Sequence, residues 1–496
     1  MARGLADGVL HPRWMSEANR GFGSAALMNY PPLGGYLVGA TSLLTGDLVS
    51  AFHLVLLLMT ALSGVAFYFC ARSFAPPLAS ALAAALYVLA PYRMIDLHAR
   101  FAFAEVCAFV WLPLLVRFLV DLRKRPGLIA WTGLVAAGTG LLFTHVLTAF
   151  MFLVVVGPLV LLVLARDSNW KALPWLGLAA LAMTAFSAAY LLPLLVERGS
   201  TYTEYLTGAW WGNWRANFLF VDPESVGVQL SPIRPLVEAG FWYSVALVVL
   251  STIIALRTRD RGAKVFLAAS MIAMFLQLSL SAVIWRLVPG MEILQFPWRF
   301  QTILVLFSCL LIARACVEIR WDSGLLAGVA MALAMFFAVF LWQGISYDVS
   351  AESLEQIQVS RLIFKEHIPR GVQDWENFEQ LPLADDGLLA TSPQAEVKVL
   401  EWSSHRRRVD IAAKESTQVT LRTFFFPGWI ATIDGEPVRI DPVAPLHVIG
   451  LEVPPGDHHL DLRFRPTPVR VLGSVSSILA AGLLLLGNLR HRRSSD

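Results

Sequence analysis

The sequence is poor in charged residues. Asp, Glu, Lys and Arg make up only 15% of its 496 residues, whereas an ordinary soluble protein carries about 25%. Hydrophobic residues account for 56%, and the mean hydropathy is +0.61. This balance excludes an ordinary soluble protein and predicts an α-helical polytopic membrane protein. The net charge is only +3, and the basic residues stand in short clusters between apolar runs, so we expect no nucleic-acid partner.

Sequence signatures of common cofactors are also missing. The chain has no Gly-rich nucleotide loop, no GKS/T motif and no zinc signature. Its cysteines lie in or beside apolar runs, without the spacing of a disulfide framework or a metal site: Cys70, Cys107, Cys309 and Cys316. We therefore predict no cofactor, with a divalent metal left open, and no intracellular nucleotide-sugar site.

Long apolar runs, in contrast, recur along the whole chain. A membrane-spanning helix needs about 20 apolar residues. The runs predict about eleven spans, at residues 48–70, 77–92, 102–121, 128–144, 147–165, 172–196, 239–256, 264–287, 299–318, 323–343 and 471–489. Between 128 and 165 the only polar break is Thr144 with His145. A moderately apolar segment at 33–45 precedes these runs and is suited to a short interfacial helix.

The basic clusters predict the orientation of these spans, because Lys and Arg favour the cytoplasmic side. With eleven spans, the basic loops all fall on one side, which we take as cytoplasmic: they contain Arg72, Arg123, Lys124, Arg125, Arg166, Lys171, Arg257, Arg259, Arg261, Lys264, Arg320, Arg490, His491, Arg492 and Arg493. We therefore expect a multi-pass protein of the inner (cytoplasmic) membrane. Residues 1–47 would then lie outside, although no apolar core follows their first charges. We expect that a first span is missing upstream of Met1, through truncation or a late start.

Four regions follow from this pattern. We expect an extracytoplasmic first loop at 1–47, a transmembrane core at 48–343, an extracytoplasmic β-rich domain at 345–470 and a final transmembrane helix at 471–489. Asp434-Gly435 and Pro454-Pro455-Gly456 are predicted turns in the β-rich domain. Six segments there are rich in β-branched and aromatic residues or alternate, and predict a small β-sandwich: 396–402, 408–411, 418–426, 429–433, 447–453 and 459–464.

The fifteen residues from Pro91 to Glu105 concentrate ionisable side chains, namely Arg93, Asp96, His98, Arg100 and Glu105. Such groups in or beside a span are costly and are functional candidates by default. The guanidinium groups of Arg93 and Arg100 are suited to bind phosphate. If the stretch is helical, Asp96 and Arg100 share a face at i,i+4, with Glu105 about a turn further into the span. A plain capping pair, with Glu105 as the buried partner of another helix, is the structural alternative.

Two further candidates are single residues on the same predicted side of the membrane. Asp7 is a candidate general base for an acceptor hydroxyl, although an Asp-Gly pair is also typical of a turn. His145 stands at a predicted tight turn between two spans, where a hydrogen-bonded interface residue is the alternative.

Arg299 and two tryptophans complete the candidates. Arg299 opens a span where neither the helix dipole nor the positive-inside bias favours an arginine, which indicates a clamp for a phosphate or a lipid headgroup. In the loop at 197–238, Trp210 and Trp211 are suited to stack on sugar rings, and equally to anchor the membrane interface.

The order of these motifs resembles a known family. The chain is similar to the bacterial integral membrane proteins labelled "6-pyruvoyl-tetrahydropterin synthase-related", and its core resembles GT-C-type glycosyltransferases. The zinc histidines of a pterin enzyme are absent. The resemblance rests on Pro12-Arg13-Trp14, Gly21-x-Gly23, Tyr30-Pro31-Pro32-Leu33, Pro91-Tyr92, the Asp96, Arg100 and Glu105 series, His145 and the residues from Phe296 to Phe300. The tail resembles a β-domain of related membrane proteins, at 426–429, 434–435 and 453–456.

The resemblance implies an inverting transfer of a sugar from a polyprenyl-phosphate donor to a lipid, glycan or protein acceptor on the extracytoplasmic face. Such enzymes carry an acidic residue in the first outer loop, and whether Asp7 is that residue stays open. The catalytic candidates are Asp7, Asp96 and Glu105. The substrate-binding candidates are Arg13, Arg93, Arg100, His145, Arg299, Trp210 and Trp211.

Two other functions are compatible with the sequence. The first is a non-enzymatic membrane protein that translocates or binds lipid-linked glycans, and the second is a catalytically inactive fragment. A translocator should carry charged residues near the middle of several spans. Here the charged residues cluster towards one side, which favours an enzyme acting at that face.

Overall fold

The structure is a computed structural model that describes residues 1–205, 212–221, 233–257, 261–318, 365–373 and 390–495, together with residues 328 and 335. It divides into two compact units. The first comprises Met1–Ala51, Ala185–Tyr205 and Asp348–Asp496, and the second comprises Phe52–Thr184 and Leu206–Tyr347. The strands belong to the first unit, and the described part of the second is helical.

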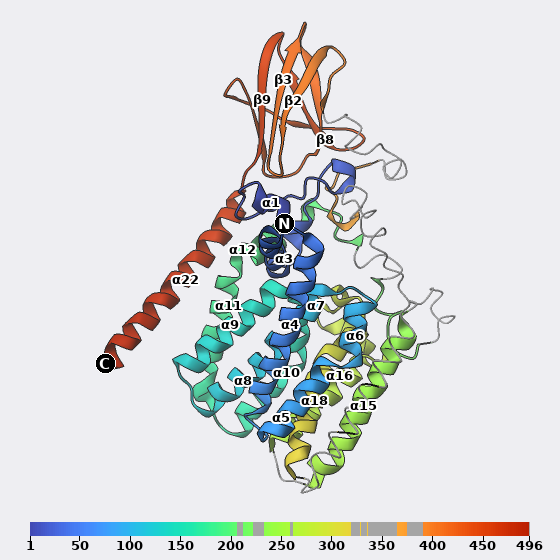
Figure 1. The fold of residues 1–496 in the computed structure, drawn as a ribbon, viewed down its shortest axis with the longest axis vertical. Helices are drawn as coiled ribbons and strands as arrows, with labels where there is room; N and C mark the ends of the chain where they lie inside the picture. Colours follow the sequence, from blue (N-terminus) through green and yellow to red (C-terminus); the bar gives the residue numbers. More distant parts are fainter. Residues whose placement is uncertain are drawn as a thin grey trace. The chain divides into compact units, whose positions relative to one another are not determined.

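The second unit is a bundle of helices (Figure 1). Prolines open α5 and α6, where a missing backbone N–H is harmless and the fixed φ suits a helix. Helix α18 packs against α5, α15 and α16, so it lies at the centre of the bundle. In chain order the helices are α4 (Leu48–Ala71), α5 (Pro77–Val88), α6 (Pro91–His98), α7 (Phe103–Ala108), α8 (Trp111–Lys124), α9 (Leu128–Thr144), α10 (Val146–Arg166), α11 (Leu173–Phe186), α15 (Arg234–Arg257), α16 (Arg261–Phe275), α17 (Ala282–Leu287) and α18 (Gln301–Glu318).

The apolar helices agree with a polytopic membrane protein. Among the described residues, six are long and apolar enough to cross a membrane: Leu48–Ala71, Pro77–His98, Phe103–Lys124, Val146–Arg166, Arg234–Thr252 and Pro297–Val317. A seventh is added if the bent pair Trp170–Phe186 and Ala188–Ser200 counts as one span. Shorter apolar helices coincide with three more expected spans, at Leu128–Thr144, Gly262–Phe275 and Pro468–Leu484. Apart from residues 328 and 335, the span expected at 323–343 lies outside the described residues.

Two expected spans are interrupted. The segment expected at 172–196 bends by 74° around Ser187, between α11 and α12 (Ala188–Glu197). The sequence analysis predicted one span at 264–287. This prediction was wrong as a continuous helix, because α16 ends at Phe275 and α17 begins only at Ala282. Between them the Ser281 hydroxyl donates to the Leu278 carbonyl at 2.8 Å. Such side-chain bonds offer the backbone an alternative to the helix.

The first unit carries a β-sandwich, as the sequence predicted (Figure 1). Its sheets have the orders β1-β4-β8-β7 and β2-β3-β9-β5-β6, and all neighbouring strands are antiparallel. Each of the six expected segments forms a strand. Asp434 and Gly435 have φ of 52° and 91°, as a tight hairpin turn requires. The described strands are β1 (Ala390–Thr391), β2 (Ala395–Trp402), β3 (Arg406–Ala413), β4 (Thr417–Phe424), β5 (Trp429–Ile433), β6 (Glu436–Val438), β7 (Asp441–Val443), β8 (Val448–Val453) and β9 (Gly456–Phe464).

The remaining helices of the first unit come from both ends of the chain and from its middle. The interfacial segment expected at 33–45 is helical as α3 (Pro32–Thr45), which packs against α1 (Ala2–Ala6). The short α2 (Ala26–Asn29) precedes it. Helix α12 packs against the C-terminal α22 (Pro468–Ser495).

The N-terminal segment contributes to the core of the β-sandwich, which the sequence analysis did not predict. Trp14 is 1% exposed. Its ring centroid lies 5.7 Å from that of Phe426, 5.8 Å from Trp429 and 5.4 Å from Phe464. The backbone N–H of Phe424 donates to the Phe22 carbonyl at 2.8 Å. Residues 1–23 are therefore an integral part of this domain rather than a separate loop.

We expect Trp14→Ala to destabilise the first unit by about 3–5 kcal/mol, because it removes a buried indole from an aromatic core. Trp170→Ala is the matched control, since Trp170 is 53% exposed, and its effect should stay within about 0.5 kcal/mol. Denaturant unfolding of the purified full chain in detergent measures both. Equal effects of the two substitutions would contradict the packing described for Trp14.

Candidate functional site

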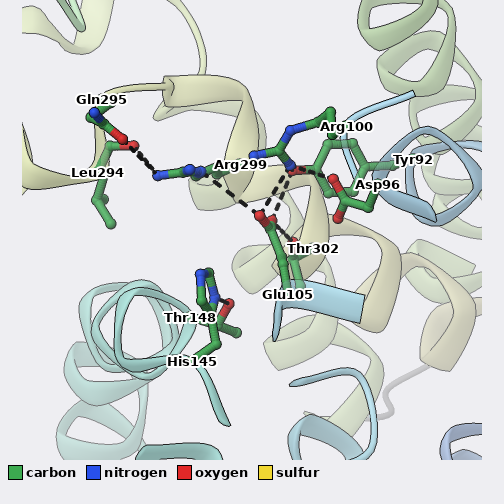
Figure 2. A network of polar contacts seen from close by, with 10 residues as sticks. All are labelled: Tyr92, Asp96, Arg100, Glu105, His145, Thr148, Leu294, Gln295, Arg299 and Thr302. Atoms are coloured by element: carbon green, nitrogen blue, oxygen red, sulfur yellow. Dashed lines mark hydrogen bonds and ion pairs between the residues drawn. The ribbon is translucent and has the colours of Figure 1, made fainter. Parts of the chain in front are cut away.

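Charged side chains from separate segments converge in the second unit (Figure 2). Asp96 lies on α6, Arg100 follows that helix, Glu105 lies on α7, and Arg299 lies in the 3-10 turn Pro297–Phe300 before α18. Their side chains are only 0%, 9%, 2% and 12% exposed, respectively. We call these four residues the Glu105 cluster. Burying four charged groups together inside an apolar bundle costs free energy, so such a cluster is a candidate functional site by default.

A break between α6 and α7 brings the cluster together. Helix α6 ends at His98, and Phe101 has a φ of 52°, a conformation that is rare for a residue with a side chain. The Ala102 N–H donates to the Asp96 carbonyl at 2.8 Å, which closes the turn. The stretch is thus not one helix. The i,i+4 pairing of Asp96 with Arg100 nevertheless forms, and the turn returns Glu105 to Arg100.

Glu105 is the centre of the cluster, and both of its carboxylate oxygens are used (Figure 2). Oε1 accepts hydrogen bonds from Tyr92 Oη at 2.8 Å and from Thr302 Oγ1 at 2.9 Å. Oε2 accepts one from Arg100 Nη1 at 3.0 Å and lies 3.7 Å from Arg299 Nε. A buried carboxylate with this many donors is held as an anion in one place.

Of the two arginines in the Glu105 cluster, Arg100 and Arg299, the charge of Arg100 is the more fully neutralised. Its Nη1 donates to Asp96, to Glu105 and, at 3.1 Å, to Tyr92 Oη. The guanidinium also lies 4.5 Å from the ring centroid of Trp298, a cation–π contact. Burial by itself lowers the pKa of Arg100, but Asp96, Tyr92 and Glu105 together raise that pKa above its ordinary value. Arg100 is therefore a permanent cation with fixed geometry.

Arg299 is less fully neutralised. Its Nη1 donates to the Leu294 carbonyl at 2.7 Å and lies 3.4 Å from Gln295 Oε1. Its Nε is buried and has no hydrogen-bond partner among the described residues. The carboxylate of Glu105, at 3.7 Å, is too distant to satisfy it. Since an unsatisfied buried donor costs about 1–3 kcal/mol, this N–H is available for an anionic ligand.

His145 lies between α9 and α10, at the break expected there, and faces the Glu105 cluster (Figure 2). Its Nδ1 is 2.7 Å from Thr148 Oγ1. Burial lowers its pKa to about 4, with Glu105 opposing and Arg299 adding to that shift. The imidazole is therefore neutral at physiological pH and is suited to hydrogen bonding rather than to charge pairing.

The structure directs Arg93 away from this cluster. Arg93 is fully buried and donates to Ser63 Oγ at 2.8 Å and Thr60 Oγ1 at 3.1 Å, both on α4. Its guanidinium lies 5.3 Å from the ring centroid of Phe109. These contacts join α4 to α6, so the burial of Arg93 is explained by helix packing and does not require a role in substrate binding.

The remaining candidates are Asp7, Arg13, Trp210 and Trp211. Asp7 and Arg13 belong to the first unit. Asp7 Oδ2 accepts a hydrogen bond from the Ser404 N–H at 2.8 Å, and Arg13 Nη2 donates to the Ala189 carbonyl at 3.0 Å. Burial, and then the charge of Arg470, lowers the pKa of Arg13 to about 10. Trp210 and Trp211 lie outside the described residues.

The sequence analysis missed three residues that hold the cluster. Tyr92 and Thr302 both bond to Glu105, and Trp298 covers Arg100. Tyr92 and Trp298 directly precede the predicted site residues Arg93 and Arg299 in the sequence. Their positions could therefore have indicated that they belong to the site. Thr302 is one of two hydroxyl residues in the apolar helix α18 and carried no such signal. Within the part of the chain that is described, no three His, Cys, Asp or Glu side chains are grouped to hold a metal.

Comparison with known proteins gives one family and one distant structural likeness. A family model described as "6-pyruvoyl-tetrahydropterin synthase related domain; membrane protein" matches residues 27–351. No protein of curated function matches the chain. The crystal structure of ArnT from Cupriavidus metallidurans bound to undecaprenyl phosphate is similar over 64% of this chain and 71% of that chain, with 14% identity and a TM-score of 0.27. The range matched by the family model contains the whole Glu105 cluster and His145.

Proposed function

This chain belongs to the 6-pyruvoyl-tetrahydropterin synthase related domain family of membrane proteins, and from that premise we propose that it is an integral membrane glycosyltransferase. It moves a sugar from a polyprenyl-phosphate donor to a lipid, glycan or protein acceptor. The observation that carries the proposal is the buried Nε–H of Arg299, which has no hydrogen-bond partner among the described residues and lies beside a second buried arginine, Arg100. A phosphate oxygen is the kind of acceptor that such a donor favours.

In this proposal Arg299 binds the phosphate of the donor, and Arg100 adds positive potential from a fixed position. When the bond between the sugar C1 and the phosphate oxygen breaks, negative charge grows on the departing polyprenyl phosphate. Arginines preorganised in a site of low dielectric stabilise that charge more strongly than water does. Glu105 keeps both guanidinium groups in place.

The acceptor oxygen forms the new bond to C1, and its proton passes to a base. Asp96 is the carboxylate of the cluster best suited to this role, because its buried Oδ2 has no hydrogen-bond partner among the described residues. Both oxygens of Glu105 are already engaged. A carboxylate in reach of the acceptor hydroxyl provides general-base catalysis of about 10²–10⁴-fold.

Helix lengths support an extracytoplasmic position for this site in the inner membrane. From Glu105 to the basic pair Arg123 and Lys124 the chain runs through α7 and α8, a rise of roughly 27 Å at about 1.5 Å per residue. The hydrocarbon core of a bilayer is about 30 Å thick. The basic loops and the Glu105 cluster would therefore occupy opposite faces, and basic loops favour the cytoplasm.

Asp96→Asn tests the chemistry of the proposal. The substitution keeps the size of the side chain but removes the base, so transfer should fall by at least about 100-fold while binding of decaprenyl phosphate by the purified full chain persists. Mass spectrometry of lipid extracts compares the glycolipids of cells expressing the wild type and the variant at equal levels. A glycolipid profile that is unchanged in the Asp96→Asn cells would overturn the assignment of Asp96 as the base. A glycolipid profile that is unchanged when the whole protein is deleted would overturn the proposed function.

A further inference from the structure

A second candidate site lies in the second unit, in a cavity of about 460 Å³ that is lined mainly by residues of α8, α10, α11, α16 and α18. Known ligand sites have volumes of about 300–1,000 Å³. Most of its lining is apolar, with side chains such as Leu119, Val160, Phe266 and Phe307. The charged groups among its lining residues are Arg123, Lys124 and Arg314. Arg123 and Lys124 lie in the last turn of α8, and Arg314 lies four residues before the end of α18. The cavity thus combines apolar walls with basic side chains near helix ends.

A polar cavity of about 450 Å³ adjoins it and shares Arg123 and Lys124 with it. Its other lining residues are Asp167, Ser168, Asn169 and Lys171. Arg123 pairs with Asp167, and the Asn169 side chain donates to the Arg123 carbonyl at 2.9 Å. These bonds hold the loop after α10 against the end of α8. Lys124 and Lys171 are both exposed there, so the polar cavity carries an excess of positive charge.

This pair of cavities is distinct from the Glu105 cluster. Arg314 lies on α18 and follows Arg299, in the 3-10 turn before that helix, by 15 residues, which corresponds to roughly 22 Å at the rise of a helix. Together with the roughly 27 Å rise along α7 and α8, this separates the cavities from the cluster by somewhat less than the ~30 Å thickness of a bilayer core. A donor phosphate bound at Arg299 would therefore leave both cavities unfilled by its headgroup.

We infer that these cavities bind an anionic phospholipid, with an acyl chain in the apolar cavity and its phosphate at Lys124 and Lys171. Apolar walls beside a basic pocket match an amphiphile with a negative headgroup. Basic pockets at the cytoplasmic ends of transmembrane helices bind acidic lipids, and each Lys or Arg contributes about 1 kcal/mol. The inference goes beyond the proposed sugar transfer and does not depend on it.

Native mass spectrometry of the purified full chain in detergent tests the inference. The probes are dioleoyl phosphatidylglycerol and dioleoyl phosphatidylcholine at equal concentration, which share their acyl chains and differ in charge. We expect the wild type to bind phosphatidylglycerol on the order of tenfold more than phosphatidylcholine. The double variant Lys124→Gln with Lys171→Gln should lose this preference.

Arg125→Gln with Arg166→Gln is the matched control. It removes two exposed charges from the same two loops, but neither residue lines a cavity, so the tenfold preference should persist. Val160→Phe, which fills the apolar cavity, should lower binding of both lipids severalfold. An equal loss of preference in both double variants, no preference in the wild type, or unchanged binding in the Val160 variant would each overturn the inference.

Discussion

Arg299→Gln is expected to weaken the binding of decaprenyl phosphate on the order of 100-fold. Removing one partner from a buried charge contact costs about 2–5 kcal/mol, and each 1.4 kcal/mol is about tenfold in affinity. The reason lies in the position of Arg299 Nε, which is buried and has no hydrogen-bond partner among the described residues. Glutamine keeps much of the packing but removes the charge. Binding of the lipid to the purified full chain in detergent is measured by microscale thermophoresis.

Three controls separate phosphate binding from general damage. Decaprenol lacks the phosphate, so its weaker binding should be the same in the wild type and in Arg299→Gln. Arg286 is an exposed arginine of the same unit, on α17, and Arg286→Gln should bind decaprenyl phosphate normally. Arg299→Lys keeps the charge without the forked donors, so it should lose about tenfold. An Arg299→Gln protein that binds decaprenyl phosphate as tightly as the wild type would remove the central support for the proposed function.

Much of the fold could be predicted because its signals are local. The apolar runs predicted the helices, and the alternation of residues 396–464 predicted the β-sandwich. The break at His145 was visible as the one polar point in a long apolar stretch. The interruption between α16 and α17 was not, because residues 276–281 carry no charge, proline or glycine and alternate leucine with Gln277, Ser279 and Ser281. The helix ends there through bonds such as that from Ser281 to the Leu278 carbonyl.

The candidate site could be predicted only in part. A sequence shows which side chains are charged, but it does not show in which direction each side chain points once the helices have packed. The pairing of Asp96 with Arg100 follows from their spacing, and it forms. Arg93 looked equivalent to Arg100, but helix packing turns it to Ser63 and Thr60. Only the packing of α18 decides that Thr302 reaches Glu105. Whether these residues act on a substrate stays a proposal.

Glu105→Gln is expected to destabilise the second unit by about 3–5 kcal/mol. Breaking a buried ion pair from one side leaves the other charge uncompensated, and here the substitution affects two arginines. The new amide can still accept from Tyr92 and Thr302 through its oxygen, but its NH₂ group would then face Arg100, donor against donor. Denaturant unfolding of the purified full chain measures the loss.

A double-mutant cycle distinguishes this electrostatic cause from lost packing. Arg100→Leu removes the cation, so adding Glu105→Gln to it should cost at least about 1 kcal/mol less than Glu105→Gln costs in the wild type. Glu292→Gln, at an exposed carboxylate in the same unit, should be nearly neutral. Additive losses in the cycle would mean that Glu105 and Arg100 are not coupled. Strong coupling would mean that Glu105 holds a cation that the protein keeps buried at some cost, as a site for an anionic substrate requires.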